Sequence, residues 1–100
     1  PNLMVESSES DVADLLAALS HHVGEVRRNP YHLRMPAWMQ DNVRLGAELV
    51  GGQGGDAPDF DFATLYRVSL WQDGGIKEAW EGGRQLATED DPRSIFTALK

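Results

Sequence analysis

The spacing of the apolar residues changes once along this chain, from the period of a helix to the period of a strand. In residues 8–27 the large apolar side chains recur every three or four positions, which is typical of one face of an α-helix. From Phe60 onward apolar and polar residues begin to alternate, which is typical of a half-buried strand. The 100 residues are therefore predicted to form an α+β fold, with a helical part (residues 1–56) and a β-meander part (residues 57–100).

Two amphipathic helices are expected in the first part, after a short strand at residues 3–5. The first helix spans residues 8–27, where Ser8 and Asp11 have the spacing of a capping box. Its apolar stripe consists of Val12, Leu15, Leu16, Leu19, Val23 and Val26. The second helix is expected to begin at Pro36, after a loop of residues 31–35, and to end at Gly51. Its buried face consists of Met39, Val43, Ala47 and Val50.

The second part is expected to hold a small antiparallel meander of three strands. The strands are predicted at residues 64–71, 76–80 and 84–88, and Asp-Gly-Gly and Glu-Gly-Gly turns separate them. Residues 51–58 contain four glycines without the spacing of a phosphate-binding fingerprint, so this segment is predicted to be a loop. A short C-terminal helix is expected to begin at Pro92 and to reach Leu99.

Charge and composition argue against several classes of partner. Sixteen acidic and nine basic side chains give a formal charge of −7, which disfavours binding to a nucleic-acid backbone. No apolar stretch approaches the roughly 20 residues that a membrane-spanning helix needs. The chain has no cysteine, so disulfides and thiolate chemistry are excluded. We therefore expect a soluble, cytoplasmic protein that contacts neither nucleic acid nor membrane.

No complete catalytic or metal site is evident in the sequence. The three histidines are His21, His22 and His32, and adjacent histidines on a helix point about 100° apart, so His21 and His22 do not converge on one ion. The serines stand outside any nucleophile-elbow pattern. No catalytic residue, metal ligand or cofactor is therefore predicted within this chain.

Aromatic and β-branched residues in the second part form the predicted contact surface. Large aromatic side chains serve as core or as interface area in a domain of this size. The residues expected at or near an interface are Leu65, Val68, Trp71 and Trp80. A homodimer is the expected result of self-association, because two-fold symmetry is the commonest closed arrangement.

Four segments can be compared as an ordered set. They are Pro-Asn-Leu-Met-Val-Glu (residues 1–6), Ala-Ala-Leu-Ser-His-His-Val-Gly-Glu-Val (17–26), Asn-Val-Arg-Leu-Gly-Ala-Glu-Leu (42–49) and Phe-Ala-Thr-Leu-Tyr-Arg (62–67). Their order and spacing resemble the C-terminal third of the PIG-L/LmbE family of zinc-dependent N-acetyl-sugar deacetylases. The family has a strand that ends in an acidic residue, followed by a helix with an Ala-Leu-x-x-His-x-Ser/Thr-Gln/Glu signature. The resemblance covers about the first 70 residues and does not extend past Trp71.

The resemblance implies a role for the end of the first helix. His22 stands at the signature histidine and Glu25 at the position where Gln is common, so both are expected to contribute to substrate binding. Gly24 departs from the pattern, because it occupies the position where Ser or Thr is usual. The family's metal motif, Pro-His-Pro-Asp-Asp-Glu, does not occur in this sequence. The implied zinc would therefore belong to the whole enzyme and not to this chain.

Two functions from different classes follow from these observations. In the first, the chain is the C-terminal segment of a zinc-dependent hydrolase that removes N-acetyl groups from amino-sugar conjugates, and it is inactive alone. Its partner is then the remainder of the catalytic domain. In the second, the chain is a non-enzymatic interaction or dimerisation domain whose exposed aromatic hairpin binds another protein.

Overall fold

The computed structural model describes residues 1–50 and 55–98, and these residues form a mixed α and β fold. Three α-helices, five strands and a 3-10 helix follow one another as β1, α1, α2, α3, β2, β3, β4, β5 and η1. Of the loop predicted at residues 51–58, residues 51–54 lie outside the described residues, as does Leu99, the predicted last helical residue. Residues 55–58 form neither helix nor strand, as predicted. The α+β class is confirmed, whereas several element boundaries and one strand pairing differ from the prediction.

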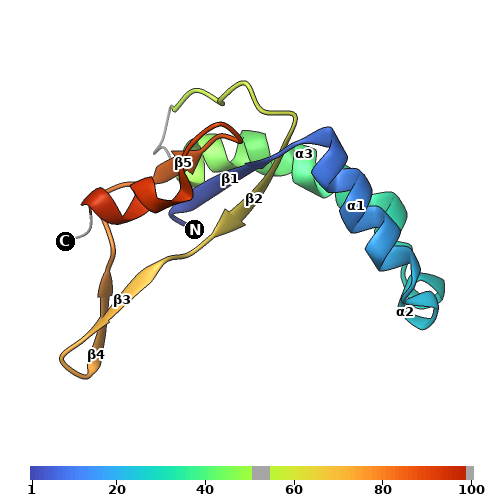
Figure 1. Ribbon diagram of the computed structural model, residues 1–100, viewed down its shortest axis with the longest axis horizontal. Helices are drawn as coiled ribbons and strands as arrows, with labels where there is room; N and C mark the ends of the chain where they lie inside the picture. The colour runs from blue at the N-terminus through green and yellow to red at the C-terminus, as the bar shows by residue number, and fades with distance from the viewer. Residues whose placement is uncertain (51–54, 99–100) are drawn as a thin grey trace.

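A three-stranded sheet joins the beginning of the chain to its end (Figure 1). β1 (Leu3–Ser7) is the central strand. It pairs antiparallel with β2 (Phe62–Tyr66) and parallel with β5 (Arg84–Leu86). The register places Met4 opposite Leu65 on one side and opposite Gln85 on the other.

The longest helix, α3 (Tyr31–Leu49), packs against this sheet. A Cβ at Gly46 would lie 2.5 Å from the Met4 methyl carbon and 2.9 Å from a Leu65 methyl carbon, so glycine allows the helix and sheet to approach closely. The predicted inner face of this helix is confirmed, because Met39, Val43, Ala47 and Val50 are all buried. One core cluster consists of Met4, Val43, Val50 and Ala63.

A second core cluster lies where the chain returns to the sheet after the hairpin. Its buried members are Leu3, Ala79, Trp80 and Leu86, and Ile95 packs against them. Ile95 belongs to η1 (Pro92–Ala98), which is a 3-10 helix at the position of the predicted C-terminal helix. The two clusters use successive residues of β1, since Leu3 and Met4 point to opposite faces of the strand.

The first predicted helix is two helices, α1 (Glu9–Ser20) and α2 (Val23–Arg28). The capping box of Ser8 and Asp11 at its start is confirmed. The end of α1 changes to the hydrogen-bond pattern of a 3-10 helix, because the backbone N–H groups of His21 and His22 donate to carbonyls three residues earlier. His22 then leaves the helical region with ψ 65°, and so the predicted single helix over residues 8–27 was wrong.

The predicted apolar stripe of this first helix is only partly covered. Val12 is buried, and Leu16 and Leu19 are half-buried. Leu15 and Val23 remain 47% and 51% exposed. Interruption of the helix at His21 and His22 also interrupts the stripe.

The loop predicted at residues 31–35 is helical instead. The N–H groups of Leu33 and Arg34 donate to the Pro30 carbonyl, so α3 begins at Tyr31 and not at Pro36. Pro36 lies inside the helix, where it has no N–H to donate to the carbonyl of His32. The preceding proline, and not Pro36, therefore marks the helix start.

The predicted three-stranded meander is replaced by a projecting hairpin and a separate strand. β3 (Ser69–Gln72) and β4 (Gly75–Glu78) form the hairpin, joined by a turn in which Asp73 and Gly74 have φ 52° and 74°. The third strand, β5, does not pair with β4 but returns to β1. The long strand predicted at residues 64–71 is divided at residues 67–68 into β2 and β3.

Candidate functional site

The side chain of Asn2 bridges the break between β2 and β3. Its Nδ2 donates to the Val68 carbonyl at 2.9 Å, and its Oδ1 accepts from the Val68 N–H at 2.8 Å. A primary amide that donates and accepts at one residue reproduces the pattern that a neighbouring strand would supply. Asn2 therefore holds the point from which the hairpin leaves the sheet.

Trp80 fixes the other side of the hairpin base. Its side chain is 2% exposed, and its indole N–H donates to the Ile95 carbonyl at 3.0 Å. The guanidinium carbon of Arg84 lies 5.5 Å from the centre of the Trp80 ring, within the range of a cation–π contact. Arg84 Nη1 also donates to the Gly83 carbonyl at 2.9 Å. These contacts hold the indole in a defined orientation.

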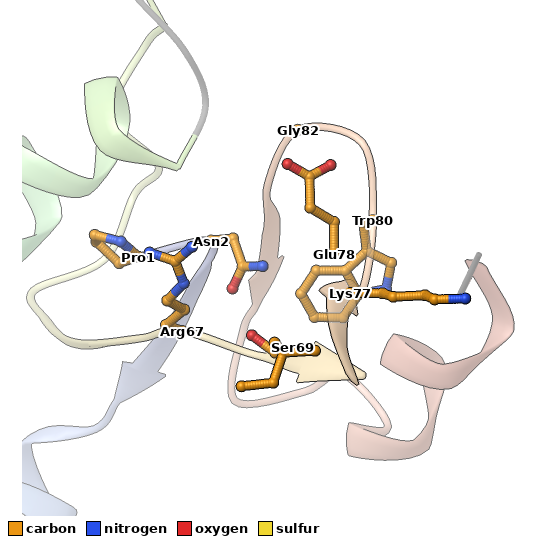
Figure 2. A pocket seen from close by; sticks show the side chains of 9 residues that line it. Pro1, Asn2, Arg67, Ser69, Lys77, Glu78, Trp80 and Gly82 are labelled. Carbon is orange, nitrogen blue, oxygen red and sulfur yellow. The ribbon is translucent and has the colours of Figure 1, made fainter. Parts of the chain in front are cut away.

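A hollow of about 340 Å³ lies between these two fixed points. Figure 2 shows Arg67 beside Pro1 and Asn2 on one side of the hollow, with Glu78 and Trp80 on the other. Ser69 from β3 and Lys77 from β4 complete the polar lining. Two cationic groups, one carboxylate and one hydroxyl suit the binding of a small polar group by charge and hydrogen bonding.

The β3–β4 hairpin carries a pair of exposed apolar side chains, and one of them, Ile76, also lines the hollow. Trp71 and Ile76 lie directly opposite each other in the β3–β4 register and are 71% and 73% exposed. Side chains at opposite positions of an antiparallel pair lie close together, so these two form one apolar patch. Ile76 was not among the residues predicted for the interface, although the two-residue turn at Asp73 and Gly74 fixes its pairing with Trp71.

His22 and Glu25, the predicted substrate-binding residues, lie far from the hollow. Both are exposed. His22 is the N-cap of α2 and Glu25 lies in its first turn, at the opposite end of the long axis from the hairpin (Figure 1). The Glu25 N–H donates to the His22 carbonyl at 3.1 Å, which is a backbone contact of the helix start. Within this chain the structure does not bring them together with the polar residues of the hollow.

The four predicted interface residues have different surroundings. Leu65 is half-buried against the core beside Gly46, and Val68 is half-buried against the second core cluster. Trp80 is enclosed by this chain's own core. Of the four, Trp71 alone has an exposed side chain, and with Ile76 it forms the exposed apolar patch on the hairpin.

Electrostatic contacts elsewhere are local. Arg93 donates from its side chain and its backbone N–H to Asp91 and holds the pKa of that carboxyl below its ordinary value of 3.8.

Among the described residues, no group of three or more His, Cys, Asp or Glu side chains could hold a metal ion. Within residues 1–50 and 55–98, no helix combines the length and apolar character that crossing a membrane requires.

Comparison with models of protein families, with curated proteins and with solved structures finds no match to this chain.

Proposed function

We propose that this chain is the C-terminal segment of a zinc-dependent hydrolase of the PIG-L/LmbE type, which removes N-acetyl groups from amino-sugar conjugates. In this proposal the segment supplies packing surface and one wall of the substrate pocket. It is inactive when separated from the remainder of the catalytic domain, and the whole enzyme acts in the cytoplasm.

The observation that carries the proposal is the packing of three of the four resembling segments against one another. Residues 1–6 contain most of β1, residues 42–49 belong to α3, and residues 62–67 contain β2. These three elements pack together around Gly46, whose missing side chain lets Met4 and Leu65 approach the helix. Segments that resemble a family in order and also form one packed centre are more informative than isolated motifs.

The described residues do not fit a zinc site. Zinc in proteins takes three or four N, S or O ligands at about 2.0–2.3 Å. No suitable group of side chains occurs in residues 1–50 and 55–98. We therefore assign no catalytic step to this segment and limit its role to packing and substrate contact.

The polar hollow is the part of the segment best suited to contact a substrate. Amino-sugar conjugates present hydroxyl groups and a charged or polar aglycone, for which Arg67, Ser69 and Lys77 are suitable partners. His22 and Glu25 remain predicted substrate contacts through the family signature. They lie at the end of the molecule opposite the hollow (Figure 1). The hollow and the His22–Glu25 region can therefore contact one substrate only if two copies or a further domain bring them together.

A second candidate is supported by the hairpin. An interaction or dimerisation domain of a non-enzymatic kind would use the exposed Trp71–Ile76 patch to bind a partner protein. Tryptophan is enriched among the residues that dominate binding energy at protein interfaces. This candidate needs neither zinc nor a further catalytic domain.

The coding frame upstream of Pro1 distinguishes the two candidates. The deacetylase proposal expects an open frame that encodes Pro-His-Pro-Asp-Asp-Glu in the same polypeptide. A start codon immediately before Pro1 would contradict it and would favour the interaction domain.

An activity assay tests the proposal independently. The 100-residue chain and the complete polypeptide, each supplied with Zn²⁺, are compared for release of acetate from N-acetylglucosaminide conjugates. We expect acetate from the complete polypeptide and none from the chain alone. Zinc-dependent turnover by the chain alone would show that the segment has a metal site of its own.

A further inference from the structure

Helix α3 has a second apolar stripe besides the face that packs on the sheet. Six positions along the helix are spaced alternately by four and three residues, which is the a and d spacing of a heptad repeat. They are Tyr31, Met35, Trp38, Asn42, Leu45 and Leu49. Trp38, Leu45 and Leu49 are 48%, 41% and 56% exposed, whereas Tyr31, Met35 and Asn42 are half-buried, so the stripe lies open mainly between Trp38 and Leu49.

The stripe is preorganised for contact with another helix. The Tyr31 and Trp38 rings meet edge to face with their centres 6.1 Å apart, which restricts the Trp38 side chain. The one polar residue, Asn42, donates from Nδ2 to the Ala63 carbonyl at 2.9 Å. Its donor is therefore partly satisfied within the chain, which lowers the cost of covering this position.

Charged residues follow one edge of the stripe at intervals of seven residues. Arg34, Asp41 and Glu48 directly precede Met35, Asn42 and Leu49, and all three are exposed. The ion pairs found within the described residues involve other side chains, namely Lys77 with Asp73 and Arg93 with Asp91. Arg34 and Glu48 are separated by two heptads, about 21 Å along the helix axis.

The opposite edge of the stripe does not present comparable charges. Its corresponding positions are His32, Met39 and Gly46, and the last two are buried against the rest of the chain. A helix that docks on the stripe therefore meets its charged neighbours on one edge only. The charge pattern along that edge determines which orientation of a docked helix is favoured.

We propose that this stripe binds a second copy of the chain, with the two α3 helices antiparallel and their two-fold axis near Asp41. In this arrangement Arg34 faces the partner's Glu48, and Glu48 faces the partner's Arg34. Two attractive pairs outweigh one like-charge pair at the axis, where Asp41 faces the partner's Asp41. A parallel arrangement would place the charged edge against the edge of Met39 and Gly46 and would form neither ion pair.

The self-complementarity of this surface favours a second copy over an unrelated partner. A two-fold contact requires that the same patch match itself in reverse, and the order Arg34, Asp41, Glu48 does so apart from its central residue. The surface is separate from the Trp71–Ile76 patch, and the proposal does not rest on the deacetylase assignment.

Charge reversal and sedimentation equilibrium test the proposal on the complete 100-residue chain. Arg34→Glu alone and Glu48→Arg alone are each expected to weaken dimerisation roughly tenfold at low ionic strength, because each replaces two attractive pairs with two repulsive ones. The double variant, R34E with E48R, restores both pairs in reverse and is expected to dimerise within about twofold of the original chain. These residues are exposed, and circular dichroism verifies that each variant keeps its helix content.

Apolar variants locate the surface. Leu45→Asp is expected to abolish dimerisation, whereas Leu33→Ala should leave it unchanged. Leu33 is 70% exposed on the same helix but lies about 140° around the axis from Trp38.

Trp71→Ala tests the hairpin patch in the same experiment. A monomer at all concentrations, a double reversal that fails to restore dimerisation, or loss of the dimer in Trp71→Ala but not Leu45→Asp would each overturn the proposal.

Discussion

The packed centre of the molecule and the β3–β4 hairpin both contain hydrogen-bonded strands, but their side chains differ greatly in burial. In the centre, Met4 and Ala63 are 0% exposed, and α3 covers the sheet. The hairpin has four paired positions on each strand, yet none of its strand residues is buried. Hydrogen bonding alone gives a two-stranded hairpin marginal stability in water, so most of the folding free energy must come from the centre.

This difference separates residues that hold the fold from residues available for binding. Trp71 lies in β3 of the hairpin, and Trp80 follows nine residues later, just after β4. The first is exposed and the second is buried. Trp80 anchors the hairpin base through Ile95, and Trp71 lies near the turn with its ring in solvent. Substitutions at matched positions should therefore have separable effects on stability and on binding.

The largest expected effect is the loss of the Trp80 anchor. Trp80→Ala removes a buried indole and should lower the free energy of unfolding by about 3–5 kcal/mol. Trp71→Ala removes an exposed ring of the same kind and should change it by less than about 0.5 kcal/mol. Urea denaturation followed by circular dichroism measures both. Equal losses in the two variants would contradict the division between centre and hairpin.

A smaller effect is expected where the hairpin joins the sheet. Asn2→Ala removes both hydrogen bonds to the Val68 backbone and should cost about 1–3 kcal/mol. Gln72→Ala, at an exposed hairpin position, is the matched control and should cost almost nothing. The same denaturation experiment reports both changes. Unchanged stability in Asn2→Ala would mean that Asn2 does not hold the hairpin in place.

Local features of the fold were predictable from the sequence because they depend on neighbouring residues. The capping box at Ser8 and the buried positions of α3 follow from spacing within one helix. The Asp73–Gly74 turn follows from the preference of such residues for positive φ. Each of these features is determined by residues within a single helix or a single turn.

Features that depend on distant contacts were not predictable in the same way. The parallel pairing of β5 with β1 joins residues about eighty positions apart. The Glu-Gly-Gly sequence before β5 is typical of a hairpin turn, so the sequence alone predicts that β5 pairs with the preceding strand. Trp80 is buried partly because Ile95 of η1 packs against its cluster. This contact between separate segments cannot be deduced from composition. For the site, the sequence indicated Trp71 but not Arg67, Ser69 or Lys77, because the hollow is lined by residues that lie far apart in the sequence, from Pro1 to Gly82.

The smallest expected effect concerns the start of η1. The Arg93 side chain lowers the pKa of the Asp91 carboxyl, so Arg93→Gln should raise that pKa toward 3.8. A lowered folded-state pKa stabilises the fold at pH values above the unfolded pKa, and this contribution disappears as the pH falls through the folded value. Both groups are exposed, so the effect on overall stability should be slight. A carboxyl-detected NMR titration that shows no change in the Asp91 pKa would contradict this interpretation.

Hydrogen exchange of the backbone amides tests the contrast between centre and hairpin most directly. β1 is paired on both sides, and its Met4 packs against α3 at Gly46, whereas the β3–β4 hairpin is a sheet of two strands. We expect the protected amides of β1 and of the buried turns of α3 to exchange only on global unfolding, and the hairpin amides to exchange through local opening at least about a hundredfold faster. Equal protection in β1 and in β3–β4 would show that the hairpin is part of the core unit, and would contradict its assignment as a surface available for binding.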